Sequence, residues 1–353
     1  MEMDDKDDTV YYWLFSIMSI MTIDYCLYEL ITFSATNSDS ARYLLSALVQ
    51  SQAAILALVV SLTIIAIQHS ASTYSIRTIA IFRKSLSFWG TILLYIGAII
   101  FELIVLESIG NGYVPEPNFS LSCIVGISIF FILIPYSLSV LNLLEPSNII
   151  KKFTNEINLM NIKQPGDKFD KIQPVVDIVI YSLNRSDTGT AIDALNELID
   201  KIASIVIKEK NCQESDEIIN AIEHLLLIHD IASEKDNSYV FIKILDCIKI
   251  IGIEAAKIEW EETAKMAITV IKQLGIEASE KQWNNTTEKA ISAIECVSEN
   301  ASEKIRKDVT EVAISDIEDV VLVASASLNK SDKITERAIS AIEKIGKKAA
   351  KKY

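Results

Sequence analysis

The sequence predicts an all-α protein: a four-span transmembrane helical domain followed by a cytoplasmic α-helical repeat domain, arranged as a solenoid or a bundle. Four apolar stretches near the amino terminus approach or exceed the roughly 20 residues that cross a hydrocarbon core. Only 6 Pro and 10 Gly occur in 353 residues, which disfavours β-rich folds because their many turns need these residues. The rest of the chain repeats an apolar pattern with the spacing of amphipathic helices.

The chain divides into a transmembrane domain over residues 1–150, a connector over 151–189 and a helical-repeat domain over 190–353. The predicted spans cover residues 11–33, 43–67, 88–109 and 121–143. The first span is the weakest because Asp24 and Glu29 interrupt it, and its acidic leading residues argue against a cleaved signal peptide. Pro135 is expected to kink the fourth span.

Basic residues in the short connections predict the orientation in the membrane. Arg77, Arg83 and Lys84 lie between spans two and three, and Lys151 and Lys152 follow span four. Residues 110–120, between spans three and four, contain neither Lys nor Arg. The two basic segments should therefore face the cytoplasm. This predicts a multi-pass protein of the cell membrane with both termini in the cytoplasm.

Span two carries a stripe of small and polar residues along one helical face, called here the polar stripe. Its members recur at every third or fourth position and are Ala47, Gln50, Ala54, Ala57, Ser61, Ile64 and Gln68. Small residues let membrane helices approach closely. A polar stripe closed by an isoleucine also resembles the wall of a water-filled pore with an apolar constriction. An oligomer could use both, so helix packing and pore lining both stay open.

Span three contains two acidic residues, Glu102 and Glu107. An acidic side chain in hydrocarbon is costly and usually faces protein or water. Glu107 is close enough to the end of the span to reach the interface. Glu102 lies deeper and is the better candidate for a functional intramembrane acid. The alternative is that Glu102 is a protonated or hydrogen-bonded packing residue.

Composition excludes several classes of function. Both parts of the chain are acidic, with 5 Lys/Arg against 12 Asp/Glu in residues 1–150 and 28 against 35 in the remainder. A nucleic-acid surface is therefore not expected. The five cysteines form no C-x-x-C pair and the three histidines are scattered, so we predict no disulfide framework, metal site or cofactor. Without a nucleophile–base pair or phosphate loop, an enzyme is not expected.

Short motifs around spans two and four resemble the domain-of-unknown-function 2254 family of predicted prokaryotic integral membrane proteins. The motifs are residues 41–46 (ARYLLS), 61–63 (SLT), Gln68, 72–77 (STYSIR), 145–150 (EPSNII) and 182–191 (SLNRSDTGTA). Ile76 departs from the proline that is usual in the family, and residues 182–191 lack the prolines that are usual there. The resemblance covers roughly residues 40–200. It implies a multi-span membrane protein and implies no activity.

The connection from Gln68 to Arg77, which includes Tyr74, follows span two on the predicted cytoplasmic side. It is a candidate for the cytoplasmic mouth of a pore. The alternative is an ordinary tight corner in which Arg77 anchors the end of the span at the interface.

From about residue 190 onward the chain contains an internal repeat. Ala-Ile pairs recur at nearly equal intervals and mark its copies, at Ala267, Ala290, Ala313 and Ala338. Apolar residues recur within each copy at spacings of three and four, which predicts one amphipathic helix per copy. The helices should break near Trp260, Trp283, Lys307 and Asn329. Two copies together approach the period of HEAT or armadillo repeats.

Small residues occupy one equivalent position in successive copies, at Gly252, Gly275, Ser298 and Gly346. They should permit close crossing of neighbouring helices. A cofactor role is not expected, because phosphate-binding glycines follow a strand and these lie inside helices.

Two functions fit these features. The first is a homo-oligomeric, ion-conducting channel in which span two lines a shared axis and the repeats assemble or gate the ring. One chain with four spans encloses too little space for a pore of its own. The second is a membrane-anchored scaffold or sensor whose repeats bind a cytoplasmic protein partner. Bilayer conductance separates the two.

Overall fold

The computed structural model describes residues 8–30, 37–73, 79, 83, 85–110, 113–167, 169–208, 216–301, 304–327 and 332–350. It separates into two compact units, Met1–Ile149 and Ile150–Tyr353. We refer to them as the membrane unit and the helical unit.

The membrane unit is a helix bundle. Its helices are α1 (Asp8–Leu30), α2 (Ser38–Thr73), α4 (Leu86–Ser108), α5 (Glu116–Phe131) and α6 (Leu133–Leu144). Three helical segments are long and apolar enough to cross a membrane, namely Ser38–Ser72, Leu86–Ser108 and Glu116–Asn142. These correspond to predicted spans two, three and four. The first predicted span forms α1 but falls outside this set, and the side chain of Asp24 lies outside the described residues.

The fourth predicted span is interrupted where a proline was expected to distort it. Helix α5 ends at Phe131, Ile132 forms a turn, and α6 continues from Leu133. Pro135 lacks a backbone N–H, and its ring crowds the carbonyl of Phe131, four positions earlier. The interruption therefore lies in the turn of helix that precedes the proline, as the sequence predicts.

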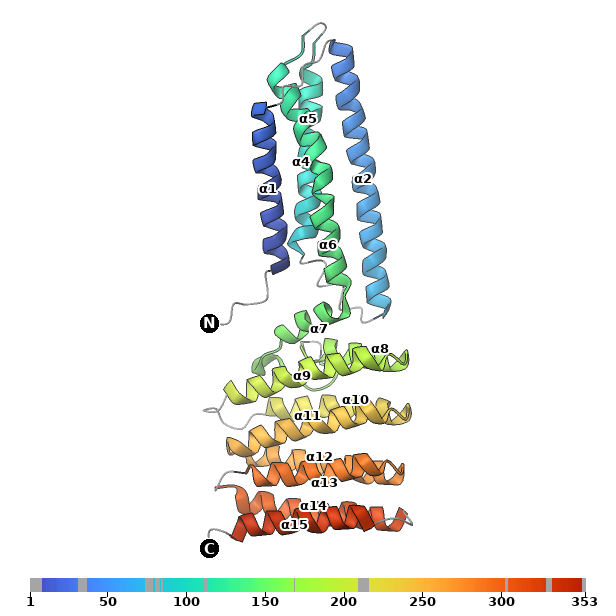
Figure 1. Cartoon of the computed structure of the whole chain (residues 1–353), viewed down its shortest axis with the longest axis vertical. Helices are drawn as coiled ribbons and strands as arrows, with labels where there is room; N and C mark the ends of the chain where they lie inside the picture. Colours follow the sequence, from blue (N-terminus) through green and yellow to red (C-terminus); the bar gives the residue numbers. More distant parts are fainter. Residues whose placement is uncertain are drawn as a thin grey trace. The chain divides into compact units, whose positions relative to one another are not determined.

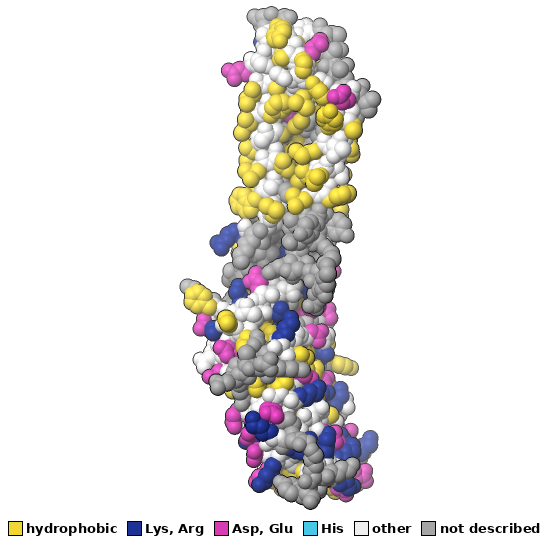
Figure 2. All heavy atoms as spheres, turned by 90° about the vertical axis from the view of Figure 1, so that its left-hand side faces the viewer, with side chains coloured by type: hydrophobic (Ala, Val, Ile, Leu, Met, Phe, Trp, Pro, Cys, Tyr) yellow, Lys and Arg dark blue, Asp and Glu magenta, His cyan; other side chains and the backbone are white. Residues whose placement is uncertain are grey.

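The bundle packs α2 against α4 and α5, and α1 against α5 and α6. One buried cluster contains Leu45, Val105 and Phe119, and another contains Tyr95 and Ile129. The outside of the same helices is rich in exposed apolar side chains, which Figure 2 shows as a broad yellow surface. A surface of this kind suits hydrocarbon and is unusual on a water-exposed protein.

The helical unit consists of a succession of helices. They are the greater part of α7 (Pro146–Asn155), the short η2 (Leu159–Asn161), α8 (Gln173–Asn184), α9 (Thr188–Lys208), α10 (Asp216–Glu234), α11 (Ser238–Lys257), α12 (Glu261–Glu280), α13 (Asn284–Glu299), α14 (Arg306–Ser327) and α15 (Asp332–Ala350). The range expected to be a connector, 151–189, thus includes a complete helix, α8.

Helices of the helical unit alternate between two layers. Helix α8 packs on α10, α10 on α12 and α12 on α14, while α9 packs on α11, α11 on α13 and α13 on α15 (Figure 1). Each copy of the sequence repeat forms one helix, and the alanines at 267, 290, 313 and 338 are buried. The helices from α8 to α13 therefore each bury an apolar face against the next helix and the next but one.

The links between these helices share one backbone conformation. The second residue after the helix has a positive φ, at Ser186, Asp236, Glu259 and Gln282. The next N–H then bonds back to a carbonyl five positions earlier, as from Trp283 to Ala278 at 2.8 Å. This is the 6→1 bond of a Schellman motif, which ordinarily has glycine at the left-handed position. The last three of these positions are evenly spaced along the chain, so the link repeats with the sequence.

Close helix crossing is present at two of the expected positions. A Cβ at Gly252 would lie 2.9 Å from Ala267 Cβ, and a Cβ at Gly275 would lie 3.0 Å from Ala290 Cβ. At Gly346 nothing lies within 4 Å of such a Cβ, so the expectation of close crossing is wrong there. Gly346 lies in α15, which has no later helix packed against it among the described residues.

The repeated link predicts a stabilising substitution. Gln282 has φ 60°, a conformation that costs a non-glycine residue roughly 1–2 kcal/mol. Its side chain is exposed. Gln282→Gly should stabilise the helical unit by about 1 kcal/mol after the flexibility of glycine in the unfolded chain is subtracted. The denaturant midpoint of the full chain in detergent would measure this gain.

Gln282→Ala is the matched control, because alanine keeps the strained φ and should give no gain. Equal effects of the two substitutions would contradict a role for backbone strain at this position.

Candidate functional site

The polar stripe lies on the outer side of α2. All seven of its residues are at least partly exposed. The inner side of α2 is formed by other residues, with Leu45, Gln52 and Thr63 buried against the bundle. Among the described residues, the stripe therefore does not pack into the bundle of its own chain. Its neighbours in a membrane are lipid, water or another copy.

Glu102 lies on the inner side of α4 and is fully buried. Gln52 of α2 donates a hydrogen bond from Nε2 to Glu102 Oε1 at 2.5 Å. The same Nε2 donates to the carbonyl of Gly126 in α5 at 3.3 Å. Three helices thus meet at one polar cluster, which we call the Glu102 cluster. Glu107, the other acid of span three, is exposed and does not belong to this cluster.

Gly126 is needed for this meeting of helices. A Cβ at this position would lie 2.7 Å from Glu102 Oε1 and 3.3 Å from Gln52 Nε2. The 2.7 Å contact would force the Glu102 carboxyl to shift, so glycine at this position lets the α5 backbone approach the amide and the carboxyl as they are placed.

Sequence reasoning selected Glu102 but missed Gln52 and Gly126. A signal for Gln52 was present: Leu45, Gln52, Thr63 and Ser70 follow one another at spacings of 7, 11 and 7 and share a helical face. All four are buried. The polar stripe, which includes Gln50, forms a more prominent pattern than the face with Gln52, because its small residues are more numerous.

Further polar side chains face the inside of the bundle. The hydroxyls of Thr63 and Tyr136 lie 2.7 Å apart, and Ser139 donates to Ser87 at 3.0 Å. Thr91 and Tyr95, on the inner side of α4, have buried hydroxyls without a hydrogen-bond partner among the described residues. The interhelical contacts of Thr63 with Tyr136 and of Ser139 with Ser87 help hold the membrane helices together.

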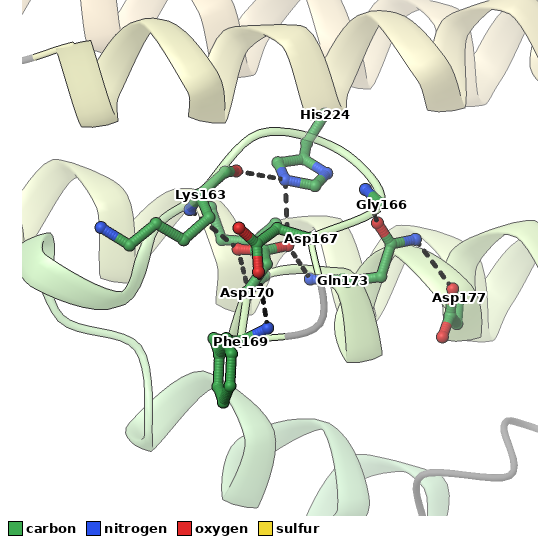
Figure 3. A network of polar contacts seen from close by, with 9 residues as sticks. Lys163, Gly166, Asp167, Phe169, Asp170, Gln173, Asp177 and His224 are labelled. Atoms are coloured by element: carbon green, nitrogen blue, oxygen red, sulfur yellow. Dashed lines mark hydrogen bonds and ion pairs between the residues drawn. The ribbon is translucent and has the colours of Figure 1, made fainter.

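The helical unit contains a second buried polar group, centred on Asp170 and His224 (Figure 3). The two side chains are fully buried, and His224 Nε2 lies 3.0 Å from Asp170 Oδ2. Asp170 also accepts hydrogen bonds from the backbone N–H groups of Lys163, Ile172 and Gln173. His224 extends from α10 into the loop that precedes α8, and it contacts the carbonyl of Lys163 as well.

These bonds set the charge state of Asp170. Burial by itself would raise the pKa of this carboxyl, but the hydrogen bonds from His224 and from the Lys163 and Ile172 amides outweigh burial, and the pKa lies below its ordinary value. The ionised carboxylate joins the loop that precedes α8 to His224 of α10. It also accepts a hydrogen bond from the N–H of Gln173, the first residue of α8.

Tyr74 and Arg77 lie outside the described residues. Within the described ranges, no group of three or more His, Cys, Asp or Glu side chains is arranged to hold a metal ion.

Residues 9–178 match the model of a family described as "Predicted membrane protein (DUF2254)". The match confirms the resemblance inferred from the motifs up to residue 150, whereas the motif at 182–191 lies beyond the matched range. The matched segment includes Gln52, Glu102 and Gly126, and it extends into the helical unit as far as Asp170 and α8. No curated protein and no solved structure matches the chain.

The Asp170–His224 pair leads to a stability prediction. Asp170→Ala removes the carboxylate, so three backbone donors lose their acceptor and the buried His224 imidazole retains the Lys163 carbonyl alone of these two partners. Removing one member of a buried pair costs about 3–5 kcal/mol. Hydrogen exchange of the full chain should accelerate over residues 156–184, measured by mass spectrometry.

Asp167→Ala is the matched control, since the exposed Asp167 bonds only locally to the Phe169 amide and should change stability by less than about 0.5 kcal/mol. The pKa of Asp170 is lowered on folding, so its contribution is present above the ordinary carboxyl range and is lost as the pH falls through the lowered pKa. Unchanged exchange in Asp170→Ala, or an effect confined to alkaline pH, would refute this role.

Proposed function

We propose that this chain, which matches a family of predicted membrane proteins over residues 9–178, is a homo-oligomeric, ion-conducting channel of the cell membrane. In this proposal α2 lines the pore around a shared axis. The helices from α8 to α15 assemble or gate the ring from the cytoplasm, where both termini lie.

The observation that carries the proposal is the uncovered side of α2. Of the apolar stretch of α2, 11% is buried inside the protein, compared with 28% of the apolar stretch of α4 and 39% of that of α5 and α6. The polar stripe runs along this uncovered side. Polar side chains that face lipid are costly, so membrane helices turn them toward protein or water. A second copy and a shared pore supply both.

The inside of the bundle supports placing the pore between copies. Leu45, Tyr95 and Ile129 lie between the helices and are buried. A path for hydrated ions through a single chain would have to displace these side chains. A path between copies needs no such change.

The members of the stripe suit different tasks in the proposed pore. Ala47, Ala54 and Ala57 are small enough to let neighbouring helices approach. Ser61 and Gln68 offer hydroxyl and amide groups to water and ions. Ile64 lies between them and would form an apolar constriction, the kind of feature that closes a pore by excluding water.

A second candidate is a membrane-anchored scaffold or sensor. The two layers of helices from α8 to α15 favour it, because stacked helix pairs usually present extended surfaces to protein partners. In this case α2 would associate with other copies or with lipid without conducting.

Substitutions in the stripe test the channel. Ser61→Trp should reduce the unit conductance several-fold, because the indole narrows the pore. Ile64→Ser should increase the open probability, because a hydroxyl lets water enter the constriction. Single-channel currents of the purified full chain in a planar bilayer measure both effects.

Leu93→Trp is the matched control. Leu93 is 66% exposed on α4, away from the stripe, so this substitution should leave the conductance unchanged. Equal loss in Ser61→Trp and Leu93→Trp would contradict pore lining by α2. Silence of folded, oligomeric protein over a range of voltage, tension, pH and calcium would favour the scaffold.

A further inference from the structure

The Glu102 cluster lacks one hydrogen-bond donor for its buried acceptor oxygens. Gln52 uses both N–H groups of its amide, one toward Glu102 Oε1 and one toward the Gly126 carbonyl. Two acceptors are left in the same cluster, Gln52 Oε1 and Glu102 Oε2. Both are buried and have no hydrogen-bond partner among the described residues. Another acceptor cannot satisfy either oxygen, so the cluster requires a donor.

A proton on Glu102 Oε2 supplies this donor. A primary amide and a carboxylic acid can pair through both polar atoms of each, with N–H bonding to the acid carbonyl and O–H bonding to the amide oxygen. The N–H half of this pairing is present at 2.5 Å. Protonation would add the O–H half, and it would use both of the unpartnered oxygens.

The surroundings of Glu102 favour the neutral acid. Among the described residues no Lys, Arg or His pairs with this carboxyl, and it lies beside Gly126 of α5, whose own neighbours include Leu48 of α2. Cys123 is the titratable side chain of α5 that faces it, and Tyr95 lies two turns away on α4. None of these groups supplies a positive charge, and an ionised carboxylate in hydrocarbon without a counter-charge is costly.

The cluster is too closed and too poor in oxygen ligands for a metal ion. Calcium takes 6–8 oxygen ligands, and magnesium needs a nearly ideal octahedron of them. The Glu102 cluster offers two unpartnered oxygens beside Gly126, where even a Cβ would be 2.7 Å from Oε1. A proton fits this space because it adds no volume.

We propose that Glu102 and Gln52 form a proton-binding site inside the membrane unit. The carboxyl carries the proton while α2, α4 and α5 are packed together. Loss of the proton leaves an ionised carboxylate whose second oxygen lacks a donor, and it weakens the contact of α2 with α4 and α5. Proton binding is thereby coupled to the packing of α2. This inference does not depend on whether the chain conducts ions.

Infrared spectroscopy of the full chain in lipid tests the site, because a protonated carboxyl has a C=O stretching band separate from those of amides and carboxylates. At neutral pH the wild type should show this band, and Glu102→Gln should abolish it. Glu107→Gln, which changes the exposed acid one and a half turns away on α4, should keep it. Alkaline buffer should remove the band from the wild type.

A pair of glutamine variants tests the partner. Gln52→Leu removes the buried amide and should shift the band toward that of a carboxyl without a hydrogen bond. Gln50→Leu removes the exposed amide two positions away and should leave the band in place. Glutamine at position 102 keeps the size and neutrality of the protonated acid, so Glu102→Gln should fold, which hydrogen exchange of α2 can verify.

Three outcomes would overturn the proposal. The first is a carboxyl region that is identical in wild type and Glu102→Gln. The second is a band that responds equally to Gln52→Leu and Gln50→Leu. The third is loss of the band at constant pH when sodium replaces choline, since this would identify a metal cation as the ligand.

If alkaline buffer removes the band without increasing hydrogen exchange in α2, the coupling to helix packing is wrong.

Discussion

Inside a membrane a polar group has no water to bond with, and its hydrogen-bond partner has to come from the protein. This constraint accounts for the buried hydrogen bonds between helices of the membrane unit. Thr63 bonds to Tyr136, and Ser87 accepts from Ser139. Gln52 divides its two donors between Glu102 and a backbone carbonyl. The same constraint gives weight to the two oxygens of the Glu102 cluster that remain unpartnered.

Helix α2 has two faces that serve different purposes. Its inner face holds Gln52 and Thr63, which join the bundle together. Its outer face carries the polar stripe, which does not pack into its own bundle. A change in the packing of the inner face would move the outer face with it, because both belong to one helix. The proposed proton site and the proposed pore would thus be connected through a single rigid element.

The helical unit follows another rule, in which one short link is repeated. Left-handed residues at Asp236, Glu259 and Gln282 follow three successive helices at equal intervals along the chain. The buried Asp170–His224 pair fixes the loop before α8 to α10. The family match ends at residue 178, between these two residues in the sequence. The pair therefore joins the matched segment to a helix that lies beyond it.

The sequence by itself determined the helical class, three of the apolar spans, the distortion at Pro135 and the period of the repeat. Each depends on neighbours that are close in the sequence, where helical geometry fixes which side chains share a face. The sequence also identified Glu102 as an acid in an apolar span, but it could not give its partners.

Only the tertiary structure brought Glu102, Gln52 and Gly126 together, because they lie on three helices and meet through side-to-side packing that no local spacing encodes. The structure likewise decided which face of α2 points inward. Two faces of that helix carried polar residues, and the burial of one followed from its fit against α4 and α5. The pairing of Asp170 with His224, which are distant in the sequence, depended on the stacking of α8 and α10 for the same reason.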